Sequence, residues 1–396
     1  MASPKDPFDA AASALGYAYQ WRSGLLLLLR GMRANLGCRL TIERIDDLSL
    51  EADTAQLFQT KRHRPGTGSL SDASEDVWKT LRVWSARVAD AGLDPLTTTF
   101  ALVTTTEAPG GSAASLLRED LSRDPEAAEK QFVETAKSST NVANRAAYDA
   151  FLALDQTKRA GMLANVYVLD GHEDIEEIGK SIEHEVLFAA EAQHLSSFRE
   201  RLEGWWFDRV VVHLVDDERT PIEAEELNVK IGDLREQYHR DSLPIDFILA
   251  EPDTIDSKND TRLFVSQLRL IAVNNSRIEA AIRDYYRAFE QRSLWIREDL
   301  LHIGELDTYE RRLVEEWRRY RAVLEDELGL ETDAEKVEFG RRFYRWMELE
   351  AKFPIRPRCE EPYVMRGSYQ ILADGSRIGW HPEFLARLQQ VMVEAR

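Results

Sequence analysis

The segment from Arg39 to Arg64 reads RLTIERIDDLSLEADTAQLFQTKRHR and decides the fold that we expect for the first part of the chain. In its first half, apolar residues interrupt polar positions in the way typical of β-structure; these are Leu40, Ile42, Ile45, Leu48 and Leu50. The second half, Gln56 to Lys61, predicts a short strand. Because side chains alternate between the faces of a strand, Gln59 and Lys61 point the same way.

An acidic turn precedes this strand, and a carboxylate from it, Asp46 or Asp47, can lie across from Gln59 and Lys61. Such a set suits metal-assisted phosphodiester hydrolysis, because oxygen atoms bind a hard divalent cation and a lysine orients the attacking water or offsets charge on the phosphate. The same residues have a plainer interpretation. An Asp-Asp pair is common in turns, and a Gln-x-Lys strand is often a solvated face.

The motifs of this region follow one another in a recognisable order: Gly16-Tyr17-Ala18-Tyr19-Gln20, an apolar helix, Glu43-x-x-Asp46-Asp47 and Gln59-Thr60-Lys61. In this order they resemble the N-terminal nuclease of the PD-(D/E)xK superfamily, and more narrowly the double-stranded DNA endonucleases that are effectors of bacterial antiphage systems. The resemblance covers roughly the first ninety residues closely and about the next hundred and sixty loosely. It implies an α/β fold with a restriction-endonuclease-like core.

The resemblance also implies a Mg²⁺-dependent site, with Mn²⁺ as the alternative ion. Asp47 would be the main metal ligand, Asp46 the reserve candidate and Glu43 a second carboxylate. Gln59 would supply a carbonyl oxygen and Lys61 a cation that orients water. Gln59 stands where the superfamily pattern has Asp or Glu, and it brings no negative charge. Metal affinity must therefore depend on Asp47, Glu43 and the substrate phosphate.

Supporting residues flank this set on both sides. Tyr17 and Gln20 lie three apart on an expected helix and share a face that would look into the metal site, although a helix-packing motif explains them equally well. Arg62 and His63 open a basic, turn-rich loop that would contact phosphates beside the scissile bond; the alternative is an ordinary surface loop.

Composition sets the limits of these interpretations. A chain of 396 residues that is 43% hydrophobic can bury a large core and form two or three domains. Its cysteines, Cys38 and Cys359, are far apart, which predicts neither a disulfide framework nor a zinc site and suits a reducing cytosol. The opening residues lack the pattern of a signal peptide, and the apolar run Leu25 to Leu29 is too short to span a membrane. We expect a cytoplasmic protein with no membrane contact.

The net charge of −19 argues at first against nucleic-acid binding. Its distribution weakens that argument, because residues 1–90 hold 12 Lys and Arg against 11 Asp and Glu, a balance of +1, and the remaining residues hold 39 against 59, a balance of −20. The nuclease-like part is thus the least acidic. The acidic remainder either limits indiscriminate DNA binding, faces a basic partner or serves solubility.

Further elements are expected along the first 252 residues, which we assign to the nuclease domain. Residues 109–163 are Ala-rich and predict a helical insertion. His213, inside an expected strand, is interpreted as a hydrogen-bonded core or edge histidine, because no second ligand lies at metal-binding spacing. The expected helices are Pro7 to Asn35, Ser71 to Val88 with Ser71 or Asp72 as cap, and an acidic helical run from Asp174 to Glu200. The expected strands are Thr98 to Thr106, Asn165 to Leu169 and Arg209 to Val215.

A polar stretch from Asp253 to Thr261 predicts a linker, and residues 256–396 predict a mainly α-helical C-terminal domain. Its long amphipathic helices are expected at Arg262 to Leu301, Gly304 to Leu328 and Asp333 to Ala351. The aromatic residues on them recur at helical spacing, which is more typical of a core than of a base-stacking surface. The Asp374-Gly375 pair predicts a hairpin between Tyr369 and Pro382, followed by a terminal helix.

A second set of motifs occupies this C-terminal part: Tyr286, Gln291-Arg292-Ser293-x-Trp295, Tyr309-Glu310, Glu316-Trp317, Gly367-Ser368, Leu372-Ala373-Asp374 and Gly379-Trp380-His381-Pro382. It resembles the C-terminal domain of effectors in bacterial three-component systems built around an SMC-like ABC ATPase. The resemblance implies a docking module for an ATPase or another defence protein. Trp380 and His381 would then be structural or interface residues.

These patterns favour a metal-dependent DNA endonuclease that serves antiphage defence. One nuclease site cuts one strand of a duplex per encounter, so we also expect a homo-oligomer. The first alternative is a catalytically silent nuclease fold that acts as an interaction subunit of an ATPase complex, and the second is a helical adaptor with no nucleic-acid role. No Gly-x-x-x-x-Gly-Lys-Ser/Thr loop is present, so any ATPase activity must come from a partner.

Overall fold

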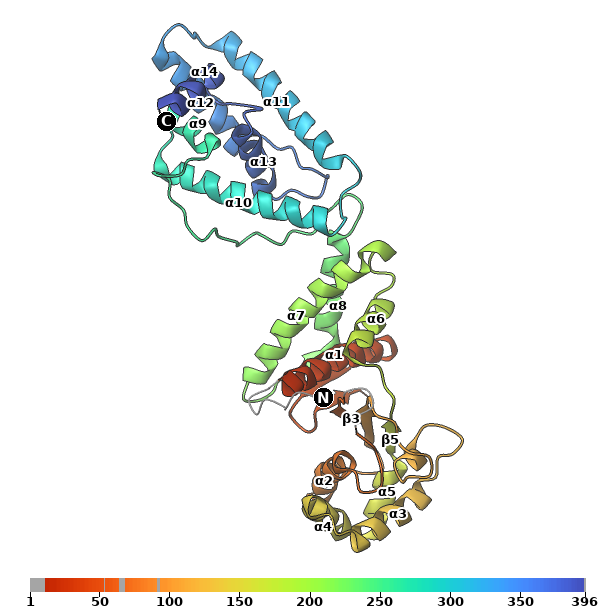
Figure 1. Cartoon of the computed structure of the whole chain (residues 1–396). Helices are drawn as coiled ribbons and strands as arrows, with labels where there is room; N and C mark the ends of the chain where they lie inside the picture. The colour runs from red at the N-terminus through yellow and green to blue at the C-terminus, as the bar shows by residue number, and fades with distance from the viewer. Residues whose placement is uncertain (1–10, 53, 64–67, 91–92, 395–396) are drawn as a thin grey trace, which may run out of the picture. The chain divides into compact units, whose positions relative to one another are not determined.

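The computed structural model describes residues 11–52, 54–63, 68–90 and 93–394. Contacts divide the chain into two units, residues 1–234 and 235–396 (Figure 1). The domain boundary predicted at residue 252 lies further along the chain than this division. The polar stretch from Asp253 to Thr261, predicted as a linker, contains no helix or strand and belongs to the second unit.

Within the described residues of the first unit, six strands form one mixed sheet in the order β5-β4-β3-β2-β1-β6. The strands are β1 (Arg39–Ile42), β2 (Leu48–Glu51), β3 (Ala55–Lys61), β4 (Thr99–Thr104), β5 (Val166–Leu169) and β6 (Ile222–Glu223). Strands β1, β2 and β3 form an antiparallel meander, and β3, β4 and β5 run parallel. The predicted Gln-x-Lys strand is therefore confirmed as β3, and it lies inside the sheet between β2 and β4.

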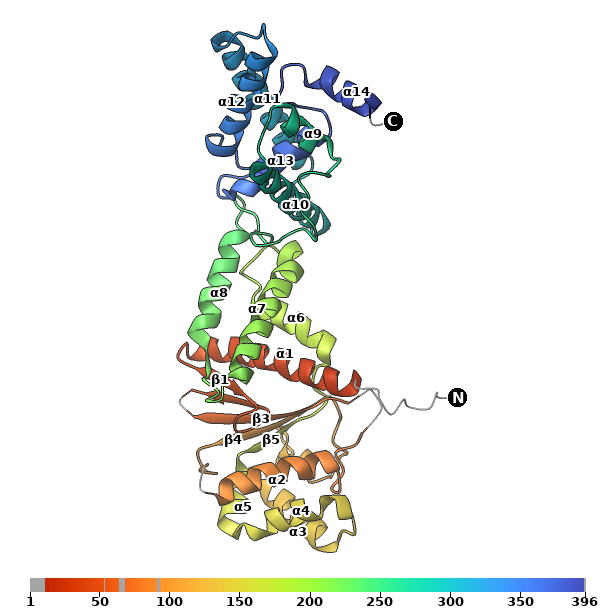
Figure 2. The ribbon, with the colours of Figure 1, turned by 90° about the vertical axis from the view of Figure 1, so that its left-hand side faces the viewer.

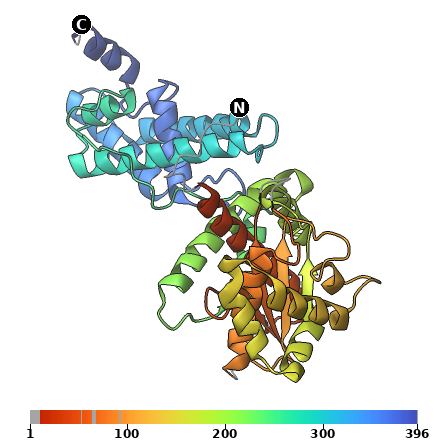
Figure 3. The same cartoon turned by 60° about the horizontal axis from the view of Figure 1, so that its bottom comes forward.

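Helices cover both faces of this sheet (Figure 2). On one face, α1 packs against β1 and β2, because Gly24 and Gly31 of α1 leave room for the side chains of Leu40, Leu48 and Leu50. On the other face, α2 to α5 form a layer that comes forward in Figure 3. The helices of the unit are α1 (Ala11–Ala34), α2 (Glu75–Ala89), α3 (Pro125–Ser138), α4 (Arg145–Ala153), α5 (Gln156–Ala164), α6 (Ile175–Glu185), α7 (Leu195–Val215) and α8 (Ala224–Gln237).

The segment Arg209 to Val215 was expected as a strand, and this prediction is wrong. It is the last part of helix α7. The buried residues of α7 recur at helical spacing: Leu195, Phe198, Leu202, Trp206, Val210 and His213. Val211, Val212 and Val215 are exposed instead. The pattern that began at Leu195 thus overrides the local β-propensity of the valines.

The predicted helix cap at Ser71 or Asp72 is also wrong, because the N-cap position of α2 is Ser74, which makes no side-chain capping hydrogen bond. Asp72 has another role: its Oδ1 accepts a hydrogen bond from the backbone of Ala113 at 2.7 Å. The strand predictions for β4 and β5 and the helical insertion between residues 109 and 163 are confirmed. The acidic run Asp174 to Glu200 is divided between α6 and the start of α7.

The second unit is helical, as predicted, although the single helix expected from Arg262 to Leu301 is interrupted between Leu270 and Asn275. Its helices are α9 (Leu263–Leu270), α10 (Asn275–Arg297), α11 (Glu305–Glu327), α12 (Asp333–Leu349), α13 (Pro362–Asp374) and α14 (Phe384–Glu394). Most of the predicted aromatic stripe lies in its core, although Phe289 is half exposed. Trp380 and His381 are buried, which agrees with a structural role. No described helix is long and apolar enough to cross a membrane.

The hairpin predicted around Asp374-Gly375 is wrong, because Tyr369 to Asp374 form the last turns of α13. The backbone N–H of Gly375 still donates to Ile371 O at 3.1 Å, and the helix ends because Ser376 has a left-handed φ of 56°. Glycine terminates a helix as readily as it forms a hairpin turn, so the Asp-Gly pair did not distinguish the two. The terminal helix that was expected to follow is α14.

Candidate functional site

The acidic turn between β1 and β2 is held closed by helix α1. Glu43 has a positive φ of 54°, and its backbone N–H donates to Asp47 O at 3.2 Å. The side-chain amide of Gln20 donates from Nε2 to the same Asp47 O at 2.8 Å and to Glu43 Oε1 at 3.0 Å. Gln20 is only 4% exposed. The amide therefore fixes both ends of the turn from the interior of the unit.

Asp47 extends from this turn to the end of β3. Its Oδ2 accepts hydrogen bonds from Thr60 N at 2.8 Å and from Thr60 Oγ1 at 3.2 Å. The same oxygen lies 3.8 Å from Lys61 Nζ, and the side chains of Asp47 and Lys61 are 21% and 25% exposed. Within the described residues these contacts all involve Oδ2, so Oδ1 is left for a further partner. The carboxylate and the ammonium thus meet where solvent reaches them.

Asp46 points elsewhere. Trp84 of α2 donates from Nε1 to Asp46 Oδ2 at 2.5 Å, and Asp47 N donates to Asp46 Oδ1 at 3.0 Å. Burial raises the pKa of Asp46 to about 7, opposed by the Trp84 hydrogen bond. Asp46 and Asp47 lie in a bend and not in a strand, so strand alternation does not decide their directions. Asp46 braces the turn against α2, and Asp47 faces β3.

Gln59 lies on β3 beside Leu102 of β4 and is 5% exposed. Its carbonyl, the free oxygen of Asp47 and the carboxylate of Glu43 are oxygen donors of the kind that Mg²⁺ prefers. Among the residues that the structure describes, no three His, Cys, Asp or Glu side chains gather closely enough to hold a metal ion. The donor chemistry fits a hard cation, and the protein supplies less negative charge than a three-carboxylate site.

The predicted supporting residues are placed in different ways. Tyr17 is 56% exposed, so it does not share the buried position of Gln20. Arg62 pairs with Asp174 at 2.9 Å, and His63 Nε2 lies 2.8 Å from Asp76 Oδ2. Arg62 and His63 follow the end of β3, and the side chains of both already pair with a carboxylate. Part of the basic loop that follows, residues 64–67, lies outside the described residues, and phosphate contact by Arg62 and His63 stays a prediction.

Two residues of this site escaped sequence reasoning. Thr60 stands between Gln59 and Lys61, and its N–H and hydroxyl hold Asp47. A strand-end threonine beside the motif is the only sequence signal for this role. Trp84 fitted the apolar face of α2, and nothing in the spacing showed that its indole N–H would meet Asp46.

His213 is a structural residue, as predicted. It is buried, and its Nε2 accepts a hydrogen bond from Ile42 N at 3.0 Å. Its Nδ1 lies 2.8 Å from Thr220 O. The imidazole therefore joins β1 to the loop after α7 and has no ring nitrogen left for a metal.

Comparison with known proteins locates a family match in the second unit. Residues 264–388 match the model described as C-terminal domain 7 of the ABC-three component (ABC-3C) systems. This match confirms the expected class of C-terminal domain and supports membership in an antiphage ABC-three component system. Such systems have several components, in agreement with a protein partner from the same system. No curated protein sequence matches the chain.

Some solved structures resemble the chain distantly. The Cap4 SAVED/CARF-domain containing receptor of Moraxella osloensis has 14% sequence identity and a TM-score of 0.34, over 66% of this chain and 60% of that chain. The Acinetobacter baumannii Cap4 receptor with the cyclic trinucleotide 3'3'3'-cAAA has 11% identity and a TM-score of 0.33, over 65% and 60%. The chain spans less than two thirds of these relatives. Such low TM-scores establish neither a shared fold nor a shared function.

Proposed function

We propose that the protein is a Mg²⁺-dependent DNA endonuclease and the effector of its ABC-three component defence system. The observation that carries this proposal is the meeting of Asp47 and Lys61 at the end of β3, with Oδ2 and Nζ 3.8 Å apart. A partly exposed carboxylate and ammonium at a strand end match the charges that phosphodiester hydrolysis uses. The sequence resemblance to PD-(D/E)xK endonucleases adds to this support.

Each residue would have a distinct task. Asp47 and Gln59 would hold the cation, with Glu43 as a further oxygen donor once it leaves Gln20. When bound, Mg²⁺ would supply a Lewis acid beside the scissile phosphate. Lys61 would orient the attacking water and offset the charge that develops on the phosphate. Thr60 and Gln20 would keep Asp47 directed at this point through the hydrogen bonds described above.

A catalytically silent scaffold is the second candidate function. It is favoured by the absence of a cluster of three His, Cys, Asp or Glu side chains among the described residues. In that case the contact between Asp47 and Lys61 would be a surface ion pair, which contributes about 0–1 kcal/mol to stability. The two candidates differ in one observable, which is cleavage of DNA that depends on a divalent ion.

The test is incubation of the purified full chain with linear and supercoiled duplex DNA, in Mg²⁺ and in EDTA. We expect cleavage in Mg²⁺ only, and loss of at least about 100-fold in rate for Lys61→Ala. Lys79→Ala is the matched control, because Lys79 is an exposed lysine of α2 that pairs with Glu75 within the helix. Full activity of Lys61→Ala would reject the assignment of Lys61. Intact DNA under all conditions, also with the partner proteins present, would favour the scaffold.

A further inference from the structure

The second unit contains a groove between α10, α12 and α13 that the proposed nuclease site does not use. One cavity of about 410 Å³ is lined by residues of all three helices, among them Asp284, Tyr344, Arg366 and Gln370. A second cavity of about 360 Å³ lies beside the start of α13. Glu348, Leu349 and Arg366 line both cavities, so the two adjoin, and together we call them the groove. Both volumes lie in the range of ligand pockets.

Two residues that line the first cavity have buried hydrogen-bonding atoms with no partner among the described residues. Gln370 is 1% exposed; its Nε2 donates to Tyr344 OH at 3.3 Å, and its Oε1 is buried with no partner. Arg366 Nε is likewise buried with no partner. Residues 366 and 370 are four apart on α13 and therefore share a face of the helix. A buried polar atom left unpaired carries a desolvation cost, which an occupant that pairs with it would offset.

The polarity of these atoms restricts the occupant. Gln370 Oε1 needs a donor, whereas Arg366 Nε–H needs an acceptor. A simple anion would satisfy only the arginine, and an ammonium group only the glutamine. A peptide group satisfies both, because it carries an N–H and a C=O. A nucleobase edge has the same polarity, but the one aromatic ring that lines this cavity, Tyr344, is almost fully buried and offers no face for stacking.

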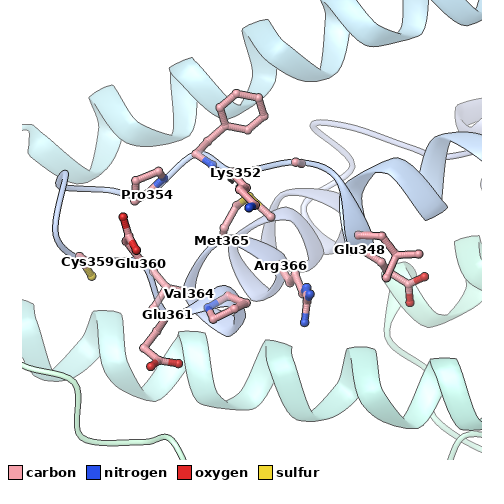
Figure 4. A pocket seen from close by; sticks show the side chains of 13 residues that line it. Glu348, Lys352, Pro354, Cys359, Glu360, Glu361, Val364, Met365 and Arg366 are labelled. Atoms are coloured by element: carbon pink, nitrogen blue, oxygen red, sulfur yellow. Dashed lines mark hydrogen bonds between the residues drawn. The ribbon is translucent and has the colours of Figure 1, made fainter.

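The second cavity provides a place for a side chain. Its middle is lined by Val364 and Met365, with Arg366 and Glu348 at one end and Cys359 and Glu360 at the other (Figure 4). Further apolar walls come from Leu349, Ala351, Phe353, Pro354 and Pro362. An apolar side chain would be buried here next to a main chain held by Arg366.

We propose that this groove binds an extended peptide segment of another protein of the same defence system. Because both atoms are buried, the side chains of Gln370 and Arg366 turn toward the peptide as it binds. Gln370 Oε1 then accepts a hydrogen bond from a peptide N–H, Arg366 Nε donates to a peptide C=O, and a neighbouring apolar side chain enters the second cavity. The choice of a protein occupant rests on the match of residues 264–388 to a domain of multi-component systems. The proposal extends the docking role of this unit and does not depend on nuclease activity.

The test uses a random linear decapeptide library that is selected on the immobilised full chain. Selected peptides are then titrated into full chain carrying ¹³C-methyl methionine. We expect the signals of Met365 and Met347, which line the two cavities, to shift. The signal of Met162, buried in the first unit, should stay unchanged. Selected peptides should share an apolar residue.

Variants of the groove make the test decisive. Arg366→Lys keeps the charge and removes the Nε donor, and Gln370→Leu removes the acceptor; each should weaken binding by about tenfold. Leu349→Arg blocks the shared wall at a residue that is 65% exposed, so the core stays intact. Arg342→Lys is the control, because Arg342 lies on α12 and pairs with Glu338. Lys61→Ala should bind the peptide normally, which separates this result from the nuclease result.

Other outcomes would overturn the proposal. A selection that enriches nothing beyond a control selection on Leu349→Arg would reject peptide binding in the groove. So would peptides that bind the Arg366 and Gln370 variants as tightly as the wild type, or that shift neither Met347 nor Met365.

Discussion

Trp84 Nε1 donates a hydrogen bond to Asp46 Oδ2 at 2.5 Å, and this contact separates the roles of two adjacent carboxylates. Asp46 is drawn into the core against α2, while Asp47 reaches Thr60 and Lys61. The other oxygen of Asp46 accepts from Asp47 N. Asp46 therefore supports the backbone from which Asp47 extends, and it does not face the proposed metal position.

The first prediction follows from this division. Asp47→Asn should lower the DNA cleavage rate by at least about 100-fold, because it removes the charge that binds the cation. Asp46→Asn should have a milder effect, since the asparagine oxygen still accepts the Trp84 hydrogen bond and only the bond from Asp47 N is lost. Cleavage rates and circular dichroism melting of both variants provide the measurement. If Asp46→Asn lowered the cleavage rate more than Asp47→Asn and left the melting temperature unchanged, Asp46 would be the metal ligand and Asp47 the supporting residue.

The second prediction concerns the clamp on the acidic turn. Gln20→Ala removes the donor to both Glu43 and Asp47 O, so the turn should lose its fixed position and the cleavage rate should fall by about tenfold. Gln20→Glu should be worse, because a carboxylate would face the carboxylate of Glu43 and the carbonyl of Asp47. The comparison is Tyr17→Ala, which alters an exposed residue of the same helix. Equal losses in Tyr17→Ala and Gln20→Ala would argue against a specific clamp.

The third prediction concerns metal affinity. Because Gln59 is neutral, the site should bind Mn²⁺ weakly without DNA and more tightly when a substrate phosphate adds its charge. Electron paramagnetic resonance can measure free Mn²⁺ with the inactive Lys61→Ala chain, with and without duplex DNA. We expect DNA to raise the affinity by roughly 5- to 150-fold, and Mn²⁺ to raise DNA affinity by the same factor. Adding Asp47→Asn should remove the coupling. Equal Mn²⁺ affinity with and without DNA would contradict the prediction that the substrate phosphate contributes to metal binding.

The sequence predicted the parts of the fold that follow short, regular patterns. The Gln-x-Lys strand and strand β4 are short runs with consecutive buried residues, and the long helices of the second unit carry a clear hydrophobic period. Two predictions failed where local preference and neighbouring residues disagree. Val210 to Val212 favour a strand and the Asp374-Gly375 pair favours a hairpin, but in both places the neighbouring residues continue a helix. Local propensity is weak compared with the packing of a long amphipathic helix.

The candidate site was predictable only in part, for the same physical reason. Residue types and spacing predicted that Asp47 and Lys61 approach each other, as they do at 3.8 Å, whereas metal binding by Gln59 stays a prediction. The partners of Asp46 and Gln20 are distant in sequence, since Trp84 follows Asp46 by 38 residues and Glu43 follows Gln20 by 23. Such contacts depend on how helices cover the sheet, and a single sequence contains no signal for them.

The fourth prediction tests the packing of α13 on α10. A Cβ atom at Gly367 would lie 2.1 Å from Asp284 O and 2.4 Å from Ala288 Cβ, so Gly367→Ala must push two helix backbones apart. We expect a loss of about 1–3 kcal/mol or more in the unfolding free energy of the second unit. Gly204→Ala in α7 is the control: no atom lies within 4 Å, and alanine should stabilise the helix by about 0.5–1 kcal/mol. Urea unfolding curves would show whether the two changes have these opposite signs.

The last prediction separates the tasks of the two units. Helix α8 ends at Gln237, so a chain that stops there keeps the whole sheet, its covering helices and the Asp47–Lys61 pair. This truncated chain should still cleave DNA weakly in Mg²⁺, because every residue assigned to the site remains. It should lose assembly with its partner proteins and protection of cells against phage, because the groove between α10, α12 and α13 is gone.

One site cuts one strand, so cutting both strands at useful rates needs copies brought together by that assembly. Size-exclusion chromatography with the partners, cleavage assays and phage plaque counts would be compared with those of full-length Lys61→Ala, which should assemble and yet fail to cleave. A truncated chain that assembled and protected as well as the full chain would assign both tasks to the first unit.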